Sequence, residues 1–243
     1  MKREKIYFAS DFHLGSPNLN ESKIREKKII SWLDSIEKDA KALYLLGDIF
    51  DFWFEYNKVV PKGFVRLLAK LAEFTDKGID IHYIVGNHDM WMCDYLEQEI
   101  GLKLHFKELI IKEDNKLIFL GHGDGLGKGD YTYKILKKVF SSSICKWLFS
   151  RLHPNFGITL GQKWSNKSRS KQKNLVNEDE EILVGYCKEQ QQQNPVDYYI
   201  FGHRHIPLNI KIDERANYIN LGDWIHHYSY AVYSDQKLEL KKF

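Results

Sequence analysis

The sequence contains few cysteines, and their positions argue against the small-domain folds that depend on them. Cys93, Cys145 and Cys187 are widely separated and lack the paired spacing of a zinc-binding motif. We therefore expect neither a disulfide framework nor a structural zinc site with cysteine ligands. A protein with so few cysteines is typical of a reducing compartment.

The sequence also lacks any long apolar run. Its charged first residues lead directly into a short strand-like segment, so neither a signal peptide nor a membrane-spanning helix is predicted. We therefore expect a cytoplasmic protein. Internal repeats and linkers rich in proline, glycine or serine are absent as well. Hydrophobic residues, at 43% of the chain, provide enough apolar surface for a globular core.

Charge is distributed unevenly along the chain. Residues 126–175, which we call the basic segment, contain eleven lysines and arginines and one acidic residue, Asp130. This segment carries a net charge of +10, which leaves −7 for the remainder. Such an asymmetry suits an anionic substrate, a nucleic acid or an anionic membrane surface. We expect one domain, with a core of residues 1–125 and 176–243 into which the basic segment is inserted as helices.

The first third of the chain alternates between apolar segments and helical patterns. Strands are predicted at 6–10, 42–46 and 79–85, and helices at 20–37 and 64–74. Polar residues follow each strand directly. This order indicates an α/β layered fold with parallel strands.

The rest of the chain contains further strands and two helical regions. We expect a hairpin of 104–112 and 116–120, a strand at 196–201, and short strands at 208–212, 218–221, 228–233 and 237–240. Apolar spacing predicts helix over 131–152 with a break at the three serines 141–143, and composition predicts a polar helix at 178–193.

Side chains that can bind metals or transfer protons follow the predicted strands. They are Asp11, His13, Asp48, Asn87, His88, His122, His203 and His205. The carboxyl ends of parallel strands share one edge of a sheet, and on an extended backbone alternate residues point to the same side. Mixed nitrogen and oxygen donors suit Mn²⁺, Fe²⁺ or Zn²⁺. So many groups exceed the needs of one ion, and we expect two ions bridged by Asp48 and the hydrolysis of a phosphoester.

These motifs resemble the motif series of the calcineurin-like metallophosphoesterases. The matching residues are Asp11-x-His13, Gly47-Asp48-x-x-Asp51, Gly86-Asn87-His88-Asp89, His122 and Gly202-His203-x-His205. The resemblance implies an αββα sandwich with two divalent ions at the strand ends, manganese first, with iron or zinc as alternatives.

The resemblance also implies roles for single residues. One ion would be held by Asp11, His13, Asp48 and His205, and the other by Asp48, Asn87, His122 and His203. His88 would be the catalytic side chain over the leaving group, and Asp89 would orient His88.

Within this family the chain is most similar to a branch that acts in lipid A biosynthesis. The supporting features are His122-Gly123-Asp124, Leu221-Gly222-Asp223-Trp224 and the helices expected after the first of these motifs. The resemblance implies hydrolysis of the pyrophosphate of UDP-2,3-diacylglucosamine. Two alternatives stay open: a phosphomono- or phosphodiesterase that acts on nucleotides or another small phosphoester, and a scaffold without activity. His88 departs from the branch, many members of which carry arginine there, and agrees with the wider family.

The composition of the basic segment suits a lid over a lipid-linked nucleotide sugar. Its aromatic and aliphatic side chains alternate with lysines, as in a helix that lies peripherally on the inner membrane surface. An amphipathic helix packed on its own domain is the alternative. Its high apolar content argues against nucleic acid as a partner. By similarity to the family we expect substrate binding by Tyr131, Asn166, Lys167, Ser168, Arg169 and Lys171.

Overall fold

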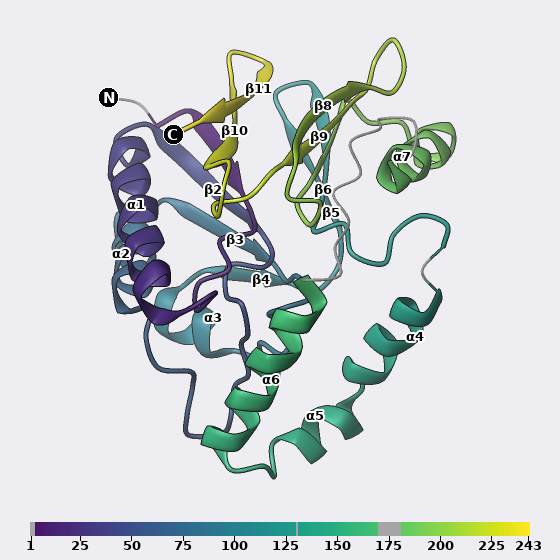
Figure 1. Cartoon of the computed structure of the whole chain (residues 1–243). Helices are drawn as coiled ribbons and strands as arrows, with labels where there is room; N and C mark the ends of the chain where they lie inside the picture. Colours follow the sequence, from purple (N-terminus) through teal and green to yellow (C-terminus); the bar gives the residue numbers. More distant parts are fainter. Residues whose placement is uncertain (1–2, 130, 170–180) are drawn as a thin grey trace.

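The computed structural model describes residues 3–129, 131–169 and 181–243, with the backbone alone for 132 and 167–169. Its strands form two sheets that pack face to face (Figure 1). The first sheet has the order β11 (Lys237–Lys242), β10 (Ser229–Ser234), β1 (Lys5–Ala9), β2 (Ala40–Leu46), β3 (Asp80–Ile84) and β4 (Lys103–His105). The second has the order β5 (Leu109–Glu113), β6 (Lys116–Gly121), β7 (Tyr198–Phe201), β9 (Asn217–Leu221) and β8 (Pro207–Lys211).

The central strands of each sheet are parallel. β1 to β4 run parallel in the first sheet, and β6, β7 and β9 run parallel in the second. The strands β10, β11, β5 and β8 pair antiparallel with their neighbours. Parallel pairing brings the carboxyl ends of the central strands to one end of the sandwich, which is where ligands bind in sheets of this kind.

The side chains of β2 show how the layers are built. Leu43 and Leu45 pack toward the helices, whereas Tyr44 and Leu46 pack toward the second sheet. This alternation buries both faces of the strand, as expected for a central parallel strand. Helices α1 (Leu19–Ile36), α2 (Val65–Asp76) and α3 (Tyr95–Ile100) cover the first sheet, and α7 (Ile182–Gln193) covers the second (Figure 1). The predicted αββα sandwich is thus confirmed.

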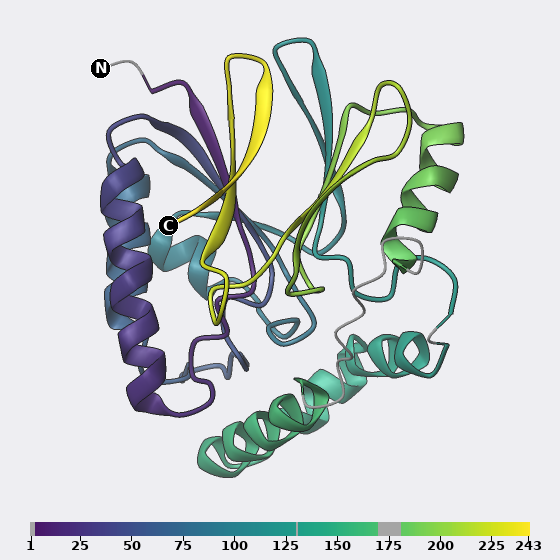
Figure 2. The ribbon, with the colours of Figure 1, turned by 45° about the horizontal axis from the view of Figure 1, so that its top comes forward.

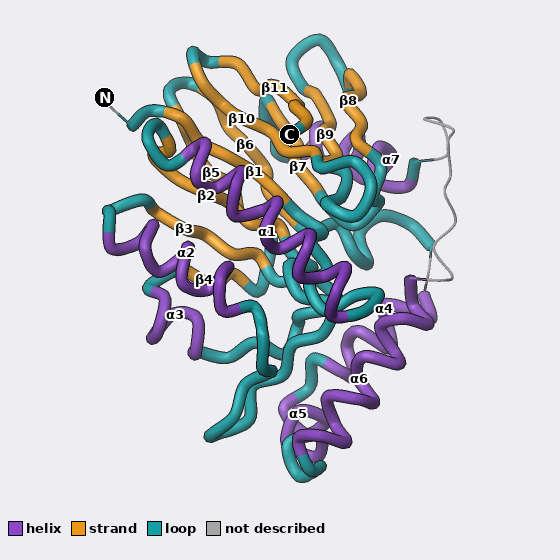
Figure 3. The backbone as a smooth tube through the Cα atoms, turned by 60° about the vertical axis from the view of Figure 1, so that its left-hand side comes forward, coloured by secondary structure: helices purple, strands orange, loops and turns teal. Residues whose placement is uncertain are grey.

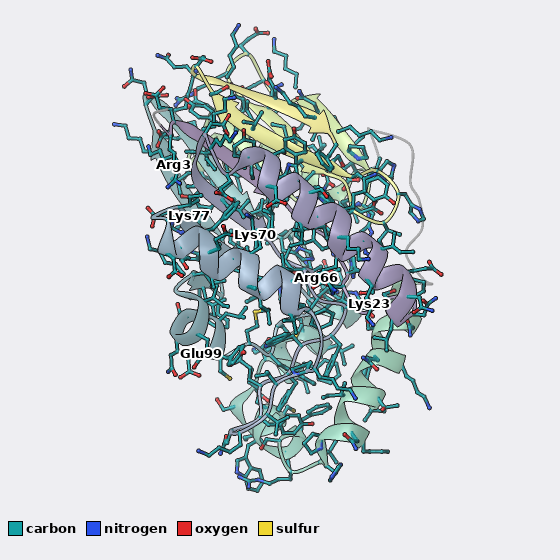
Figure 4. The ribbon with its side chains drawn as sticks, turned by 90° about the vertical axis from the view of Figure 1, so that its left-hand side faces the viewer. Arg3, Lys23, Arg66, Lys70, Lys77 and Glu99 are labelled. Atoms are coloured by element: carbon teal, nitrogen blue, oxygen red, sulfur yellow. The ribbon has the colours of Figure 1, made fainter. Side chains whose placement is uncertain are left out.

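A buried lysine joins the two long helices of the first layer. The Lys70 ammonium on α2 lies 2.7 Å from Asp34 and 2.5 Å from Glu37, both on or next to α1, and 2.9 Å from Glu73. Figure 4 shows Lys70 where the two helices lie side by side. The three carboxylates compensate the burial of the charge, which fixes α2 against α1.

One predicted strand is wrong. The segment 104–112 is divided between the sheets, because β4 pairs in parallel with β3 while β5 pairs antiparallel with β6. The chain crosses from one sheet to the other between them, at residues 106–108. The predicted hairpin therefore exists only as β5 and β6, and the apolar pattern missed the crossover because it continues through both short strands.

Three consecutive helices follow β6, with no strand between them among the described residues. They are α4 (Tyr131–Phe140), α5 (Ser143–Phe149) and α6 (Pro154–Arg169), and we call them the insert helices. Figures 2 and 3 show them together at one end of the sandwich. The predicted break between α4 and α5 is confirmed, since the Ser142 hydroxyl accepts a hydrogen bond from the Cys145 amide as the N-cap of α5.

Two other helices differ from the sequence expectation. α3 is too short for its periodicity to be recognised, and α6 begins at Pro154, which apolar spacing alone did not mark as a helix start. Residues 178–180 of the predicted helix 178–193 lie outside the described residues, and the rest forms α7. Among the helices that the structure describes, none combines the length and the apolar character that crossing a membrane requires.

Candidate active site

Two clusters of ligand-type side chains lie at the carboxyl ends of the parallel strands. The potential ligand atoms of Asp11, His13 and His205 all lie within 4.8 Å of one another. Those of Asp48, His122 and His203 do so as well. Each cluster reproduces three of the four ligands that the sequence predicts for one ion.

Asp48 lies between the two clusters. One of its carboxylate oxygens, Oδ2, lies 3.3 Å from His122 Nε2 and 3.7 Å from His13 Nε2. The other, Oδ1, accepts a hydrogen bond of 2.8 Å from the His88 amide. The Asn87 side-chain oxygen lies 3.1 Å from His122 Nε2. Asp48 thus lies next to histidines of both clusters, and Asn87 lies beside His122 of the second cluster.

The sequence predicted an extended backbone at these ligands, and this prediction is wrong for five of them, where the backbone is left-handed. The φ angles are 55° at Asp11, 44° at His13, 55° at Asp48, 67° at His203 and 57° at His205. Residues other than glycine adopt this region only at a cost of about 1 kcal/mol or more each, and such residues cluster at functional sites. The left-handed turns direct the ligands of different strands toward one centre.

Two glycines in the motifs permit the close approach of the strand ends. Gly47 has a φ of 83°, and a Cβ atom there would lie 2.6 Å from His122 Nδ1. A Cβ atom at Gly86 would lie 2.2 Å from the Asp48 carboxylate. Any larger residue would therefore push the ligands apart, which explains the glycine before Asp48 and before Asn87.

A second layer of acceptors orients three of the imidazoles. His122 Nδ1 lies 2.7 Å from the Leu46 carbonyl oxygen, so this nitrogen donates and Nε2 faces the centre. His205 Nδ1 lies 3.4 Å from Asp223, and His13 Nδ1 lies 3.3 Å from Asp51. Partners of this kind fix the ring and the tautomer of histidines that bind metals.

The carboxylates create a strong demand for positive charge at this centre. Burial alone lowers the pKa of His122, but the Asp48 carboxylate outweighs it and raises that pKa to about 10. Asp11 outweighs burial at His205 in the same way, raising its pKa to about 10. At His203, burial and the neighbouring His122 lower the pKa to about 4. A divalent cation can satisfy the same demand.

The donor set fits divalent metal ions. The Oδ1 atom of Asp11 is buried and has no hydrogen-bond donor among the described residues, although it lies 3.2 Å from His205 Nε2. A buried carboxylate oxygen without a donor is costly unless a cation compensates it. Together with imidazoles, which bind metals in their neutral form, and an amide oxygen, this is the ligand chemistry of borderline divalent ions.

His88 lies beside these clusters and is held through one ring nitrogen. Its Nδ1 atom lies 3.0 Å from the Asp51 carbonyl oxygen and 2.6 Å from the Ser165 hydroxyl. The carbonyl oxygen only accepts, so Nδ1 carries the hydrogen. The other nitrogen, Nε2, lies 3.9 Å from the Asp48 carboxylate. Burial lowers the pKa of His88, and Asp48 opposes this only in part.

The expected role of Asp89 is wrong. Its carboxylate accepts hydrogen bonds from the Tyr83 hydroxyl, the Gly86 amide at 2.7 Å and the Ile49 amide at 2.9 Å. Asp89 therefore ties its own loop to the end of β2 instead of orienting the His88 ring. Burial, followed by the nearby Asp48 charge, raises the pKa of Asp89 to about 6. The sequence placed Asp89 beside His88, but successive residues of a turn point in different directions.

A cavity of about 200 Å³ opens beside His88. Its lining includes Asn87, His88 and Asp51 and consists mostly of aromatic and aliphatic side chains. Those of the core are Phe52, Trp53, Met90 and Trp91, and those of the insert helices are Leu136, Phe140, Phe149, Leu160 and Trp164. The insert helices thus complete an apolar space that begins at the candidate catalytic residue.

The predicted substrate-binding residues fare less well than the metal ligands. Tyr131 does not line this cavity: its side chain is 72% exposed, and Tyr133, on the opposite side of α4, lines the cavity. Substrate binding by Tyr131 stays a prediction. Asn166 is exposed on α6. The side chains of Lys167, Ser168 and Arg169, and all of Lys171, lie outside the described residues, so their contacts with the nucleotide stay predictions.

Three residues that position the site were not assigned a role from the sequence. Asp51 contacts His13 and His88, and Asp223 contacts His205. The motifs Gly47-Asp48-x-x-Asp51 and Leu221-Gly222-Asp223-Trp224 contained the signal for both. Ser165 was missed because its relation to His88 depends on how α6 packs, although a small residue recurs every fourth position before it.

The chain is similar in sequence to proteins named as phosphoesterases and hydrolases. A sequence model described as calcineurin-like phosphoesterase matches residues 4–207. The "UDP-2,3-diacylglucosamine hydrolase" of Porphyromonas gingivalis is 38% identical, with coverage of 98% of this chain and 97% of the relative. A Haemophilus influenzae protein of the same name is 26% identical over 96% of both chains. Among solved structures, the Escherichia coli phosphoesterase Yfce has a TM-score of 0.49 and 15% identity, covering 98% of this chain and 92% of that one.

Proposed function

The chain belongs to the calcineurin-like phosphoesterase family, and from this membership we propose that it hydrolyses the pyrophosphate bond of UDP-2,3-diacylglucosamine. The products would be UMP and 2,3-diacylglucosamine 1-phosphate, as in lipid A biosynthesis. The names of its relatives support this substrate, since two of them are 38% and 26% identical over almost their whole length.

The cavity beside His88 is the observation that carries the proposal. Its lining combines Asn87 and His88 with mostly apolar side chains, to which both the core and the insert helices contribute. An enzyme for small soluble phosphoesters needs no such space. A diacylated nucleotide sugar needs it next to the scissile bond, because its acyl groups are attached to the sugar that carries one of the two phosphates.

Two divalent ions would be held by the two ligand clusters, with Asp48 shared between them. We propose manganese, with iron or zinc as alternatives. Bound ions would supply Lewis acidity toward the phosphoryl oxygens and lower the pKa of a water molecule. The buried Asp11 oxygen without a donor supports an ion at the first cluster.

The residues of the chain itself would orient the reaction. The Asp51 carbonyl and the Ser165 hydroxyl hold the Nδ1 hydrogen of His88, which leaves Nε2 for the leaving group. A phosphate monoester is a weakly basic leaving group, so His88 would act through the positive charge of its protonated ring more than through full proton transfer. Burial lowers the pKa of His88, so the charge of the bound substrate would have to favour this protonated form. Asp89 would keep the loop of His88 in place by accepting hydrogen bonds from the amides of Ile49 and Gly86, which lie in the loops after β2 and β3.

The insert helices would form a lid that also contacts the membrane. Several apolar side chains point away from the cavity and are more than half exposed. They include Ile135, Ile144, Trp147 and Leu148, with the Arg151 guanidinium 4.8 Å from the ring centre of Trp147. Exposed apolar groups among cations suit an anionic lipid surface. The protein would then act peripherally at the cytoplasmic face of the inner membrane, with its substrate delivered from the bilayer.

The decisive experiment measures the activity of the purified protein on three substrates in the presence of Mn²⁺. These are UDP-2,3-diacylglucosamine in mixed micelles, the UDP-sugar without acyl chains, and a generic aryl phosphate. We expect release of UMP from the diacylated substrate at a kcat/KM at least about 100-fold above the other two, because each buried methylene contributes about 0.8 kcal/mol. Turnover of the aryl phosphate without action on the lipid would instead support a phosphatase for small soluble substrates.

A further inference from the structure

Small residues form a stripe along one face of α6. Gly157, Gly161 and Ser165 are spaced by four residues, so they lie one above the other on the helix. The stripe faces the loop that follows β2. Gly157 lies against Tyr56, Gly161 lies against Phe52, and the third position reaches His88.

The two glycines set how close α6 approaches this loop. A Cβ atom at Gly161 would lie 2.2 to 2.6 Å from three ring carbons of Phe52. A Cβ atom at Gly157 would lie 2.2 Å from the Tyr56 hydroxyl oxygen. Contacts of this length do not occur between real atoms, so with any other residue either the helix or the facing aromatic side chain would have to move. The close seat is what lets the short side chain of Ser165 reach the catalytic loop.

The contact of Ser165 with His88 is buried and well formed. The hydroxyl oxygen lies 2.6 Å from His88 Nδ1, and both residues are less than a tenth exposed. The same Nδ1 hydrogen faces the Asp51 carbonyl at 3.0 Å. Of these two acceptors, one belongs to the core and the other to the insert helices. The His88 ring therefore receives its complete set of acceptors only when α6 is seated.

We infer that Ser165 is a positioning residue that couples the seating of α6 to the orientation of His88. This inference rests on the proposed function in one respect: it takes His88 as the group that acts on the leaving group. The lid then has a role in catalysis besides covering the acyl chains. A substrate that closes the cavity seats α6 and, through Ser165, aligns His88 Nε2.

A double-mutant cycle tests the coupling, with kcat and KM measured for the wild type, Ser165→Ala, His88→Ala and the double variant. In the wild-type background, Ser165→Ala should lower kcat about ten-fold, the effect of one lost hydrogen bond in the transition state, and change KM less than about two-fold. In the His88→Ala background the same substitution should lower kcat less than about two-fold, because the group it positions is gone. Ser165→Thr, which keeps the hydroxyl, should restore most of the activity.

Equal losses in both backgrounds would overturn the inference, because Ser165 would then act on the substrate directly. So would a loss confined to KM. Thr159→Val is the matched control, since it removes an exposed hydroxyl from the same helix, and it should leave kcat unchanged. The cycle is measured with bis(4-nitrophenyl) phosphate as well as with the diacylated substrate. Failure of the lipid substrate alone would thus reject the proposed function while the coupling is still measured.

Discussion

The candidate metal centre and the insert helices differ in how they are built. The centre is formed by strand ends, and most of its ligands are buried. The insert helices leave large apolar side chains such as Ile144, 71% exposed, and Trp147, 56% exposed, in contact with solvent. They meet the core through a few contacts, among them the Trp91 indole nitrogen, which donates to the Phe140 carbonyl at 2.8 Å.

In this arrangement the candidate metal centre would carry out the reaction, and the insert helices would select the substrate. Left-handed turns and close glycine contacts make the metal centre rigid, and such strain persists only where the surroundings enforce it. The insert helices supply the apolar half of the cavity and one acceptor for His88. Members of a family can thus differ in substrate when they retain the metal ligands and differ in the inserted helices.

Substitution at the centre should have the largest effect. Asp48→Ala removes the one carboxylate that lies between both clusters, and we expect activity to fall at least about 1,000-fold. Binding of Mn²⁺ to the folded chain should raise the melting temperature by linkage, and the variant should lose this increase. Calorimetry with and without Mn²⁺ checks the second effect independently of any assay.

Asp76→Ala provides the control for this comparison. Asp76 is exposed at the end of α2, so its loss should change neither the activity nor the increase in melting temperature. An Asp48→Ala variant that keeps the full Mn²⁺ effect would show that the ions do not bind at the two clusters.

Substitution of His88 should have the next largest effect, and its size depends on the replacement. His88→Ala should lower kcat about 100-fold or more, the usual contribution of a positioned acid or cation. His88→Arg should stay within about ten-fold of the wild type on the diacylated substrate, because a permanent cation suffices for a phosphate leaving group. Steady-state kinetics of both variants decide this. Equal losses would mean that a proton donor is required, and hence a more basic leaving group.

The metal centre could be predicted because its information is local. Each ligand directly follows an apolar strand, as in Leu46-Gly47-Asp48, so knowing the strands places the ligands at one edge. The structure brings Asp11, His13 and His205 together as expected. The pattern could not give the direction of each side chain, which the left-handed turns determine. This is why the predictions of an extended backbone at the ligands and of an orienting role for Asp89 were wrong.

The insert helices could be predicted only in part, for the same reason. Apolar spacing indicated α4 and α5, but it could not show which apolar face meets the core and which meets solvent. Tyr131 and Tyr133 are equally suitable by composition, and the packing of α4 places only Tyr133 at the cavity. The contact between Ser165 and His88 joins residues 77 positions apart, so no local pattern reveals it.

A substitution on the outer face of the insert helices should have an intermediate effect. Ile144→Glu combined with Trp147→Glu removes two exposed apolar groups of α5, and we expect binding to anionic vesicles to weaken about ten-fold. The melting temperature should change little, because neither side chain is buried. Sedimentation with vesicles of defined composition measures this. Ile110→Glu, at an exposed position of β5, is the control and should bind like the wild type; an unchanged α5 variant would argue for a lid that contacts only the substrate.

The smallest expected effect is on stability. It is tested by comparing substitutions of two histidines, one in the first sheet and one among the insert helices. His82 on β3 stacks between Tyr44 and His105, and burial, followed by Lys103, lowers its pKa to about 4. Between about pH 6.5 and pH 4 the unfolded chain therefore binds more protons at this residue than the folded chain does, so its contribution to stability is complete above pH 6.5 and is lost as the pH falls.

Replacing His82 by glutamine should therefore reduce the loss of stability between pH 7 and pH 5 by on the order of 1 kcal/mol or less, since the side chain is only partly buried. Urea unfolding in the presence of a chelator measures the difference without a contribution from metal ions. His153→Gln, between α5 and α6, removes an exposed histidine and should leave the pH dependence as it is. An equal effect of both substitutions would mean that protonation in the insert helices also changes the free energy of unfolding of the core. The two regions would then unfold as one cooperative unit.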